Sequence, residues 1–205
     1  MLAVASGVAC AGAFEPNVKP APAPLPTQTP QTPDDIINPV LPPRYAAADS
    51  EYFTEHPLMV PVAGIDPARL PDTFYERRDG VRIHKSQDIL APRGTPVLAA
   101  ADGTIMRMSQ NTLGGITIYQ VDSDKRYVFY YAHLDHYSDA MTVGRDVRQG
   151  DVLGYVGTSG NAPPDTPHLH FQAMRKENGR RDWWNGTPID VRPFMLRAGR
   201  AIEGQ

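Results

Sequence analysis

The sequence predicts an all-β fold: a small domain of antiparallel β-sheet or β-sandwich type, preceded by a disordered Pro-rich linker. From about residue 57 onward, short apolar runs alternate with turn signals that contain glycine or aspartate. No long stretch shows the 3.6-residue period of an amphipathic helix. Residues 16–43 contain ten of the 21 prolines, too many for a packed helix or sheet. We therefore expect three parts: a leader at 1–13, a linker at 14–50 and a folded domain at 51–200.

Length and composition narrow the class of protein. A chain of 205 residues can form one domain of ordinary size with an extension. Its net charge of −3 gives no broad positive field, so we expect no binding to nucleic acid. Cys10 is the one cysteine, which rules out an internal disulfide and a cysteine-rich metal site. Any metal must therefore be held by histidine and carboxylate side chains.

The first 13 residues, "MLAVASGVACAGA", are small and mostly apolar and carry no charged side chain. The run is too short for a lasting transmembrane helix, but it fits the hydrophobic part of a secretion signal, although the usual basic start is missing. Cleavage before Phe14 is one outcome. The other is lipidation of Cys10, because "GVAC" loosely resembles a bacterial lipobox. We predict export and slightly favour the lipoprotein; the alternative is an unprocessed, disordered apolar end.

The linker owes its character to proline, which fixes its own backbone angle and biases the preceding residue toward extended conformations. Such a segment acts as a semi-rigid spacer of about 3.1 Å per residue. After an export signal, a spacer would hold a domain away from a membrane. A plain disordered tail fits the same composition equally well.

Within the predicted domain, two turns and one long strand stand out. Asp102-Gly103 predicts a two-residue hairpin turn, and residues 122–125 predict another. Strand geometry sends alternate side chains of "RYVFYYAHL" to opposite faces. We expect one face to hold Tyr127, Phe129, Tyr131 and His133, and the other to hold Val128, Tyr130, Ala132 and Leu134.

The segment "TPHLHFQA" alternates between polar and apolar side chains. On a strand, His168, His170 and Gln172 share one face, while the apolar residues between them face the core. An imidazole face over a cleft would suit a metal site. Two surface histidines on a half-exposed strand would give the same pattern, so this motif alone is weak evidence.

A second motif lies upstream, where His84 and Asp88 stand four residues apart in "RIHKSQDI". On a straight strand their Cα atoms would be ~13 Å apart, too far to share an ion. The segment must therefore curl if both are ligands; otherwise they are an exposed histidine and a turn aspartate. Two imidazoles and one carboxylate with an open position are typical of catalytic zinc sites. His133 and the other histidine of the pair would then be free for proton transfer or oxyanion stabilisation.

Several segments, taken in order, resemble the LytM/lysostaphin-type zinc metallopeptidases, peptidase family M23. They are "HKSQDI", "GTPVLAAADGTI", "YYAHL" and "GRDVRQGDVLGYVGTSGNAPPDTPHLHF", and the likeness spans roughly residues 57–195. The resemblance implies a small antiparallel β fold with an open zinc groove. It implies one Zn²⁺ ion bound by His84, Asp88 and His170, with catalytic roles for His133 and His168.

The family cuts peptides of bacterial peptidoglycan, so the resemblance also implies a peptidoglycan hydrolase of the periplasm or cell envelope. D,D-type cross-links fit an exported protein, for which lipid at Cys10 would be an anchor. Some relatives have lost key histidines and activate cell-wall amidases without cutting. Because the key residues are all present here, we prefer the catalytic interpretation. A structural or sugar-binding β domain with incidental histidines is the third alternative.

One position departs from the family pattern H-x-G-x-D, because Ser86 replaces the glycine. If that position needs a positive φ, serine adds strain of about 1 kcal/mol.

Other residues carry weaker predictions. Arg82 could bind a substrate carboxylate, although a solvated arginine is the simpler interpretation. We assign His136 to the surface, His56 to a flexible segment before the domain, and Trp183 and Trp184 to packing over the sheet or a groove wall.

Overall fold

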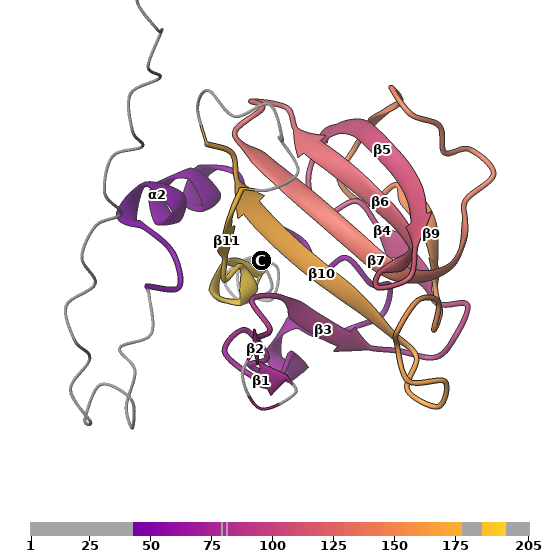
Figure 1. The fold of residues 1–205 in the computed structure, drawn as a ribbon. Helices are drawn as coiled ribbons and strands as arrows, with labels where there is room; N and C mark the ends of the chain where they lie inside the picture. The colour runs from indigo at the N-terminus through magenta and orange to yellow at the C-terminus, as the bar shows by residue number, and fades with distance from the viewer. Residues whose placement is uncertain (1–42, 79, 81, 178–185, 196–205) are drawn as a thin grey trace, which may run out of the picture. The chain divides into compact units, whose positions relative to one another are not determined.

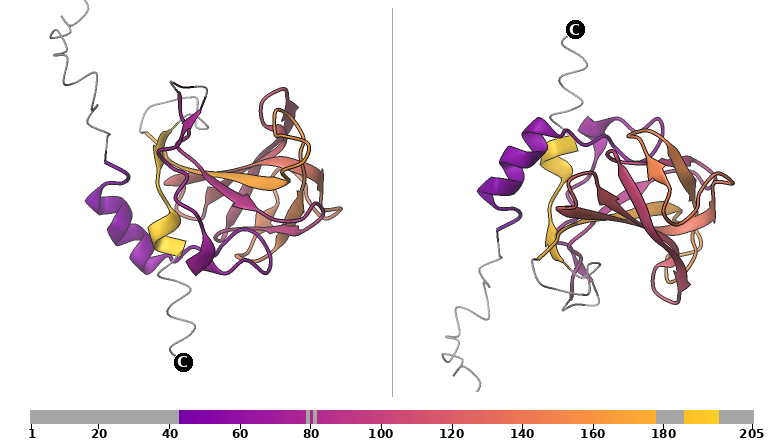
Figure 2. Two further views of the ribbon diagram at one scale, coloured as in Figure 1. Left: turned by 90° about the horizontal axis from the view of Figure 1, so that it is seen from below. Right: turned by 90° about the horizontal axis from the view of Figure 1, so that it is seen from above.

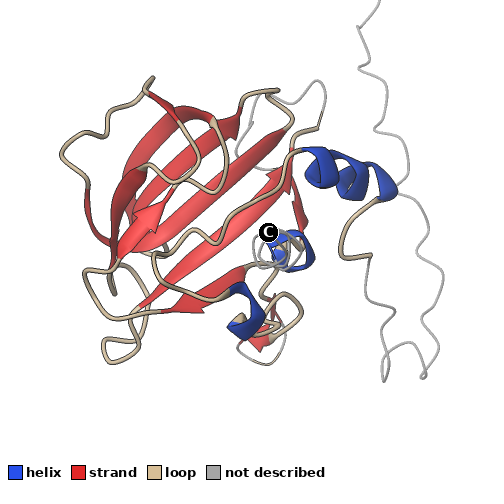
Figure 3. Cartoon of the chain, turned by 180° about the vertical axis from the view of Figure 1, so that it is seen from behind, coloured by secondary structure: helices blue, strands red, loops and turns tan. Residues whose placement is uncertain are grey.

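A computed structural model describes residues 43–78, 80, 82–177 and 186–195. The predicted leader with Cys10, residues 14–42 of the predicted linker, and the pair Trp183 and Trp184 lie outside the described residues. Strands dominate the described part, and its helices are short (Figure 3). The predicted all-β fold is therefore confirmed. Among the described residues, no helix has the length and apolar character needed to cross a membrane.

The strands form a nine-stranded and a two-stranded sheet, and every pairing is antiparallel. The larger sheet follows the path β11-β10-β7-β6-β5-β8; β3 also pairs with β10, and β9 joins β7 to β4 (Figure 1). The small sheet pairs β1 with β2. The strands are β1 (Arg77–Arg78), β2 (Arg82–Ile83), β3 (Gln87–Leu90), β4 (Pro96–Leu98), β5 (Gly103–Asn111), β6 (Gly115–Asp122), β7 (Tyr127–Tyr137), β8 (Asp146–Val147), β9 (Val152–Val156), β10 (His168–Arg175) and β11 (Thr187–Ile189).

The core lies against one face of the two long central strands. Leu169 and Phe171 of β10 are fully buried there together with Phe129 and Tyr131 of β7. Burying side chains of this size stabilises the fold by about 1.5–3 kcal/mol each. The alternation predicted for β10 is confirmed, because Leu169 and Phe171, which alternate with the two histidines, face the core.

The alternation predicted for β7 is wrong beyond Tyr131. Ile118 pairs with Tyr131 but Ile116 pairs with Leu134, so β7 carries one more residue than β6 in this interval. His133 takes the extra place with a φ of 61°. A bulge of this kind re-aims side chains. As a result Leu134 joins Tyr131 in the core, and His133 turns to the opposite face.

Of the two predicted turns, one is confirmed and one is wrong. Residues 123–126 connect β6 to its partner β7, as expected. Asp102-Gly103, in contrast, joins strands that do not pair with each other, since β4 pairs with β9 and β5 with β6 and β8. Glycine is required at 103 by close packing, because a Cβ there would lie 2.0 Å from the carbonyl oxygen of Val121. The Asp102 carboxylate accepts a hydrogen bond from the backbone of Gln149.

The described part of the chain begins at Pro43, ahead of the domain start that we predicted at residue 51. No proline occurs between Pro43 and Pro57, so the helix α2 (Ala47–Glu55) can form ahead of the sheet. Arg44 pairs with the buried carboxylate of Asp190 at 2.6 Å, which ties this segment to the residues after β11. The 3₁₀ helix η1 (Pro67–Arg69) follows further along the chain.

Helix α2 is attached to the sheet by the fully buried carboxylate of Asp49. The carboxylate accepts hydrogen bonds from the hydroxyl of Tyr127 at 2.9 Å and from Nη1 of Arg175 at 2.7 and 2.9 Å. It also accepts from the backbone of Ala46, which satisfies one free N–H at the helix start. Phe53 of α2 packs on Phe194, and both views of Figure 2 show the helix beside residues 186–195.

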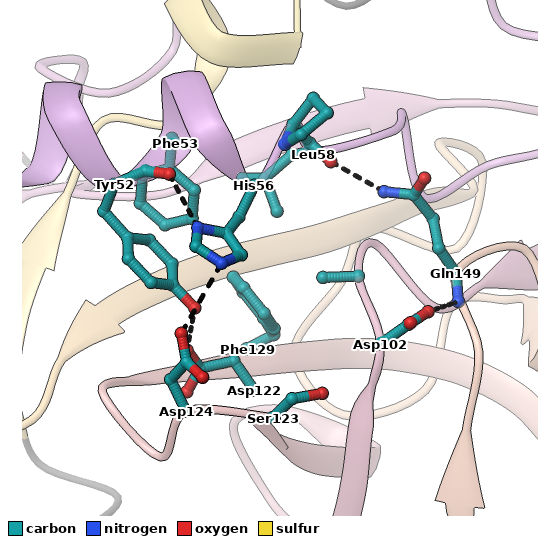
Figure 4. A pocket seen from close by; sticks show the side chains of 12 residues that line it. Tyr52, Phe53, His56, Leu58, Asp102, Asp122, Ser123, Asp124, Phe129 and Gln149 are labelled. Carbon is teal, nitrogen blue, oxygen red and sulfur yellow. Dashed lines mark hydrogen bonds and ion pairs between the residues drawn. The ribbon is translucent and has the colours of Figure 1, made fainter.

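His56 packs against the end of α2, whereas we predicted that it lies in a flexible segment before the domain. Its ring stacks on Tyr52 with 4.2 Å between centroids, and its Nδ1 donates to the Tyr52 carbonyl (Figure 4). The Tyr52 hydroxyl donates to Asp122 at 2.6 Å. These side chains line a pocket of about 340 Å³ that also includes Asp124.

Replacing Asp49 with alanine should lower the free energy of unfolding by ~3 kcal/mol, because the change leaves a half-buried guanidinium and a buried hydroxyl without their partner. Urea denaturation followed by circular dichroism measures this. Glu51→Gln on the same helix is the control and should stay within about 0.5 kcal/mol of the unchanged chain. Equal stabilities of Asp49→Ala and Glu51→Gln would contradict the role given to Asp49.

Candidate active site

The face of the sheet opposite the core carries a cleft of about 350 Å³. All five residues that the resemblance singled out lie along it. His84 and Asp88 come from the segment around β3, His133 from the bulge of β7, and His168 and His170 from β10. Tyr130 of β7 also lines the cleft, so the bulge places Tyr130 and His133 on the same side of the sheet.

His84 and Asp88 converge because the chain turns sharply between β2 and β3, as their spacing requires. Lys85 adopts a φ of 58°, and the turn brings Nε2 of His84 to 3.1 Å from Oδ1 of Asp88. Ser86 is buried and does not take a positive φ. The strain considered for serine therefore falls on the exposed Lys85 instead. The Ser86 carbonyl accepts a hydrogen bond from Thr73, which fixes the turn.

His170 joins them through strand pairing, because it is the antiparallel partner of Asp88 between β10 and β3. Its Nδ1 lies 3.0 Å from Oδ1 of Asp88 and 3.1 Å from Nε2 of His84. Ligands about 2.0–2.1 Å from a tetrahedral zinc ion lie about 3.3 Å from one another. The three atoms thus form a triangle of nearly the size that zinc needs, and their chemistry suits zinc as well.

Neighbouring groups prepare these side chains to bind a cation. Nδ1 of His84 donates to the Thr73 carbonyl at 3.0 Å, which leaves the lone pair of Nε2 for a metal. Burial lowers the pKa of His170 and so favours its neutral form. Burial opposes the ionisation of Asp88, but the adjacent imidazoles of His170 and His84 outweigh it and hold the pKa of this carboxyl well below its usual range.

His133 and His168 sit beside the triangle with matching orientations. Nδ1 of His133 donates to the Ser159 carbonyl and Nδ1 of His168 to the Thr166 carbonyl, both at 2.8 Å. In the neutral form of either ring, Nε2 is therefore the acceptor nitrogen. The two ring centroids are 4.9 Å apart, and Nε2 of His168 lies 4.0 Å from Oδ1 of Asp88. Burial lowers the pKa of His133 to about 4, so it is neutral at neutral pH.

The remaining predicted residues fall as follows. Arg82 is exposed and lines the cleft. His136 is on the surface, as predicted, and pairs with Asp135. His56 lines a different pocket.

Sequence reasoning missed Arg78 and Ser159. Arg78 touches the outer oxygen of Asp88 at 2.5 Å, and Ser159 orients His133. The sequence signals Arg78 only through the cluster of arginines in "RRDGVR", just before the HxxxD motif. That cluster does not distinguish Arg78 from Arg77 or Arg82.

An antiparallel β domain with a His–Asp–His triangle and two further imidazoles in an open cleft is the architecture of a metallopeptidase. The model of peptidase family M23 matches residues 82–190, more than half of the sequence. The chain belongs to this family.

Two relatives illustrate the likeness in sequence. The L-Ala–D-Glu endopeptidase of Bacillus subtilis (strain 168) is 39% identical over 109 residues, covering 51% of this chain and 33% of that protein. The peptidoglycan DD-endopeptidase ShyC of Vibrio cholerae is 31% identical over 115 residues, covering 54% and 25%. The chain therefore spans a third or less of the length of these relatives.

A solved structure shows the likeness in fold. The antimicrobial peptidase lysostaphin from Staphylococcus simulans matches with a TM-score of 0.55 at 26% identity. The match covers 70% of this chain and 54% of lysostaphin.

Replacing Asp88 with alanine should lower zinc affinity by more than ~100-fold, because one of three candidate ligands is lost. The loss should exceed the 10–100-fold that is typical when a residue hydrogen-bonded to a ligand is removed. Competition against a chromophoric chelator measures the affinity. His136→Ala, which removes an imidazole outside the cleft, should bind zinc like the unchanged chain. Retention of zinc by Asp88→Ala at full affinity would remove Asp88 from the ligand set.

Proposed function

We propose that the chain is a zinc-dependent endopeptidase that hydrolyses peptide bonds in bacterial peptidoglycan. One Zn²⁺ ion would be held by His84, Asp88 and His170. The observation that carries this proposal is the triangle of Nε2, Oδ1 and Nδ1 atoms, each 3.0–3.1 Å from the next. Membership of peptidase family M23 supports the reaction class.

A zinc ion bound there would supply Lewis-acid chemistry, polarising the scissile carbonyl and lowering the pKa of water. His133 accepts the proton of the attacking water at Nε2, since the ring is neutral at neutral pH and the Ser159 carbonyl holds its other nitrogen. It then gives this proton to the amine that leaves when the C–N bond breaks. His168 faces the same space, and with a proton on Nε2 as well as on Nδ1 it would donate a hydrogen bond toward the oxyanion. Arg82, exposed at the cleft, binds a carboxylate of the substrate.

The bond that is cut is proposed to be a D,D-type peptide cross-link. The relatives carry names for different bonds, L-Ala–D-Glu in one and DD in another, so family membership leaves the choice open. The predicted export signal favours a substrate in the periplasm or cell envelope, and lipidation at Cys10 would anchor the enzyme to a membrane there. A non-catalytic activator of amidases is disfavoured because none of the five key side chains is replaced.

His133→Ala should retain zinc but hydrolyse peptidoglycan about 10²–10⁴-fold more slowly, the usual loss for a general base. Dye release from labelled sacculi measures turnover, and zinc content is measured on the same sample. His136→Ala is the matched control and should keep full activity. Unchanged turnover in His133→Ala would remove its assigned role.

Incubation with defined muropeptides, followed by mass spectrometry of the fragments, tests activity and bond choice together. We expect cleavage at the D,D cross-link, loss of cleavage with chelator and recovery on adding Zn²⁺. Fragments that arise equally with chelator would contradict metal dependence. Cleavage between L-Ala and D-Glu would overturn the bond choice alone, and absence of any cleavage at full zinc occupancy would favour the activator.

A further inference from the structure

We propose that Arg78 is a positioning residue of the metal centre: it holds the outer oxygen of Asp88, so that Asp88 offers a single oxygen to the metal. The inference rests on the zinc site proposed above. Nη2 of Arg78 donates to Oδ2 of Asp88 at 2.5 Å. The other oxygen, Oδ1, faces Nε2 of His84 and Nδ1 of His170. The two oxygens of one carboxylate thus have separate partners.

Arg78 is itself held in place for this contact. It lies on β1, where it pairs in register with Arg82 of β2. Its Nη2 also lies 3.1 Å from Oε2 of Glu76, so Glu76, Arg78 and Asp88 form a chain of alternating charge that leads to the metal site. Asp88 is only 15% exposed, so water screens its contact with Arg78 less than it would screen a surface pair.

Holding the Arg78 guanidinium in this position costs free energy. We therefore infer that its contact with Asp88 determines where the guanidinium lies. Nε of Arg78 is buried and has no hydrogen-bond partner among the described residues. An unsatisfied buried donor costs about 1–3 kcal/mol. Nη2 also lies 3.3 Å from Nδ1 of His84, a nitrogen whose proton already goes to the Thr73 carbonyl. The charge-assisted bond to Asp88 is the strong interaction that can offset this cost.

The contact controls how many metal positions Asp88 can fill. A carboxylate can bind a metal through one or both oxygens. With Oδ2 held by Arg78, three protein ligands would leave the fourth position of a tetrahedral ion open. Without Arg78, the carboxylate can turn and offer both oxygens, which changes the coordination number. An outer-shell contact of this kind typically contributes 10–100-fold to metal affinity.

Two measurements on the purified full chain test this role in the variant Arg78→Gln. Zinc affinity, from competition with a chromophoric chelator, should fall 10–100-fold. The visible spectrum of the Co²⁺-substituted protein should change from the intense four-coordinate type to the weaker five-coordinate type. Arg77→Gln, which removes the exposed neighbouring charge on the same strand, should leave both unchanged.

Other outcomes contradict the inference in distinguishable ways. If the cobalt spectrum and the zinc affinity of Arg78→Gln are both unchanged, the role proposed for Arg78 is wrong. If folding stability also falls in that case, Arg78 has a purely structural role. A rise in zinc affinity would mean that repulsion between the guanidinium and the metal dominates. Failure of the unchanged chain to bind either metal would overturn the zinc site itself. If Arg78→Gln does not fold, Arg78→Lys carries the test and should change both measurements in the same direction by a smaller amount.

Discussion

The antiparallel register of β3 against β10 is the constraint on which the rest of the site depends. It places Asp88 directly opposite His170, so the carboxylate and the imidazole meet across the two strands. A slip of one residue would turn every side chain of β10 to the other face, sending His168 and His170 into the core and Phe171 into the cleft. The cost of exposing Leu169 and Phe171 therefore keeps the cleft residues in place, although neither apolar residue touches the cleft.

The bulge of β7 allows this strand to supply both a cleft residue, His133, and a core residue, Leu134, after Tyr131. Strict alternation would point His133 into the hydrophobic core. Ser159 stabilises the interruption, since its hydroxyl donates to the Leu134 carbonyl and accepts from the backbone N–H of Ile116. Its carbonyl also holds Nδ1 of His133. One residue of a distant loop thus replaces sheet hydrogen bonds and sets the tautomer of a candidate catalytic imidazole.

These features explain how far the sequence could predict the structure. The faces of β10 followed from local alternation, and the convergence of His84 and Asp88 required a turn that the structure locates at Lys85. The orientation of His133 could not be predicted, because a bulge depends on contacts with β6 and on Ser159, neither of which leaves a periodic signal. The hairpin predicted at Asp102-Gly103 was wrong for a related reason. Glycine is needed at 103 because the backbone of Val121, a residue far along the chain, packs closely against it.

The same register is stabilised at the far end of β10 by a contact that local patterns do not predict. Tyr127 and Arg175 are partners across β7 and β10, and both bind the buried carboxylate of Asp49. If the two strands slipped, these two donors would separate and Asp49 could satisfy only one of them. Because a buried carboxylate that loses its partner is costly, α2 favours the same alignment of β10 that sets His170 against Asp88. The helix thereby supports the geometry of the cleft without contributing a side chain to it.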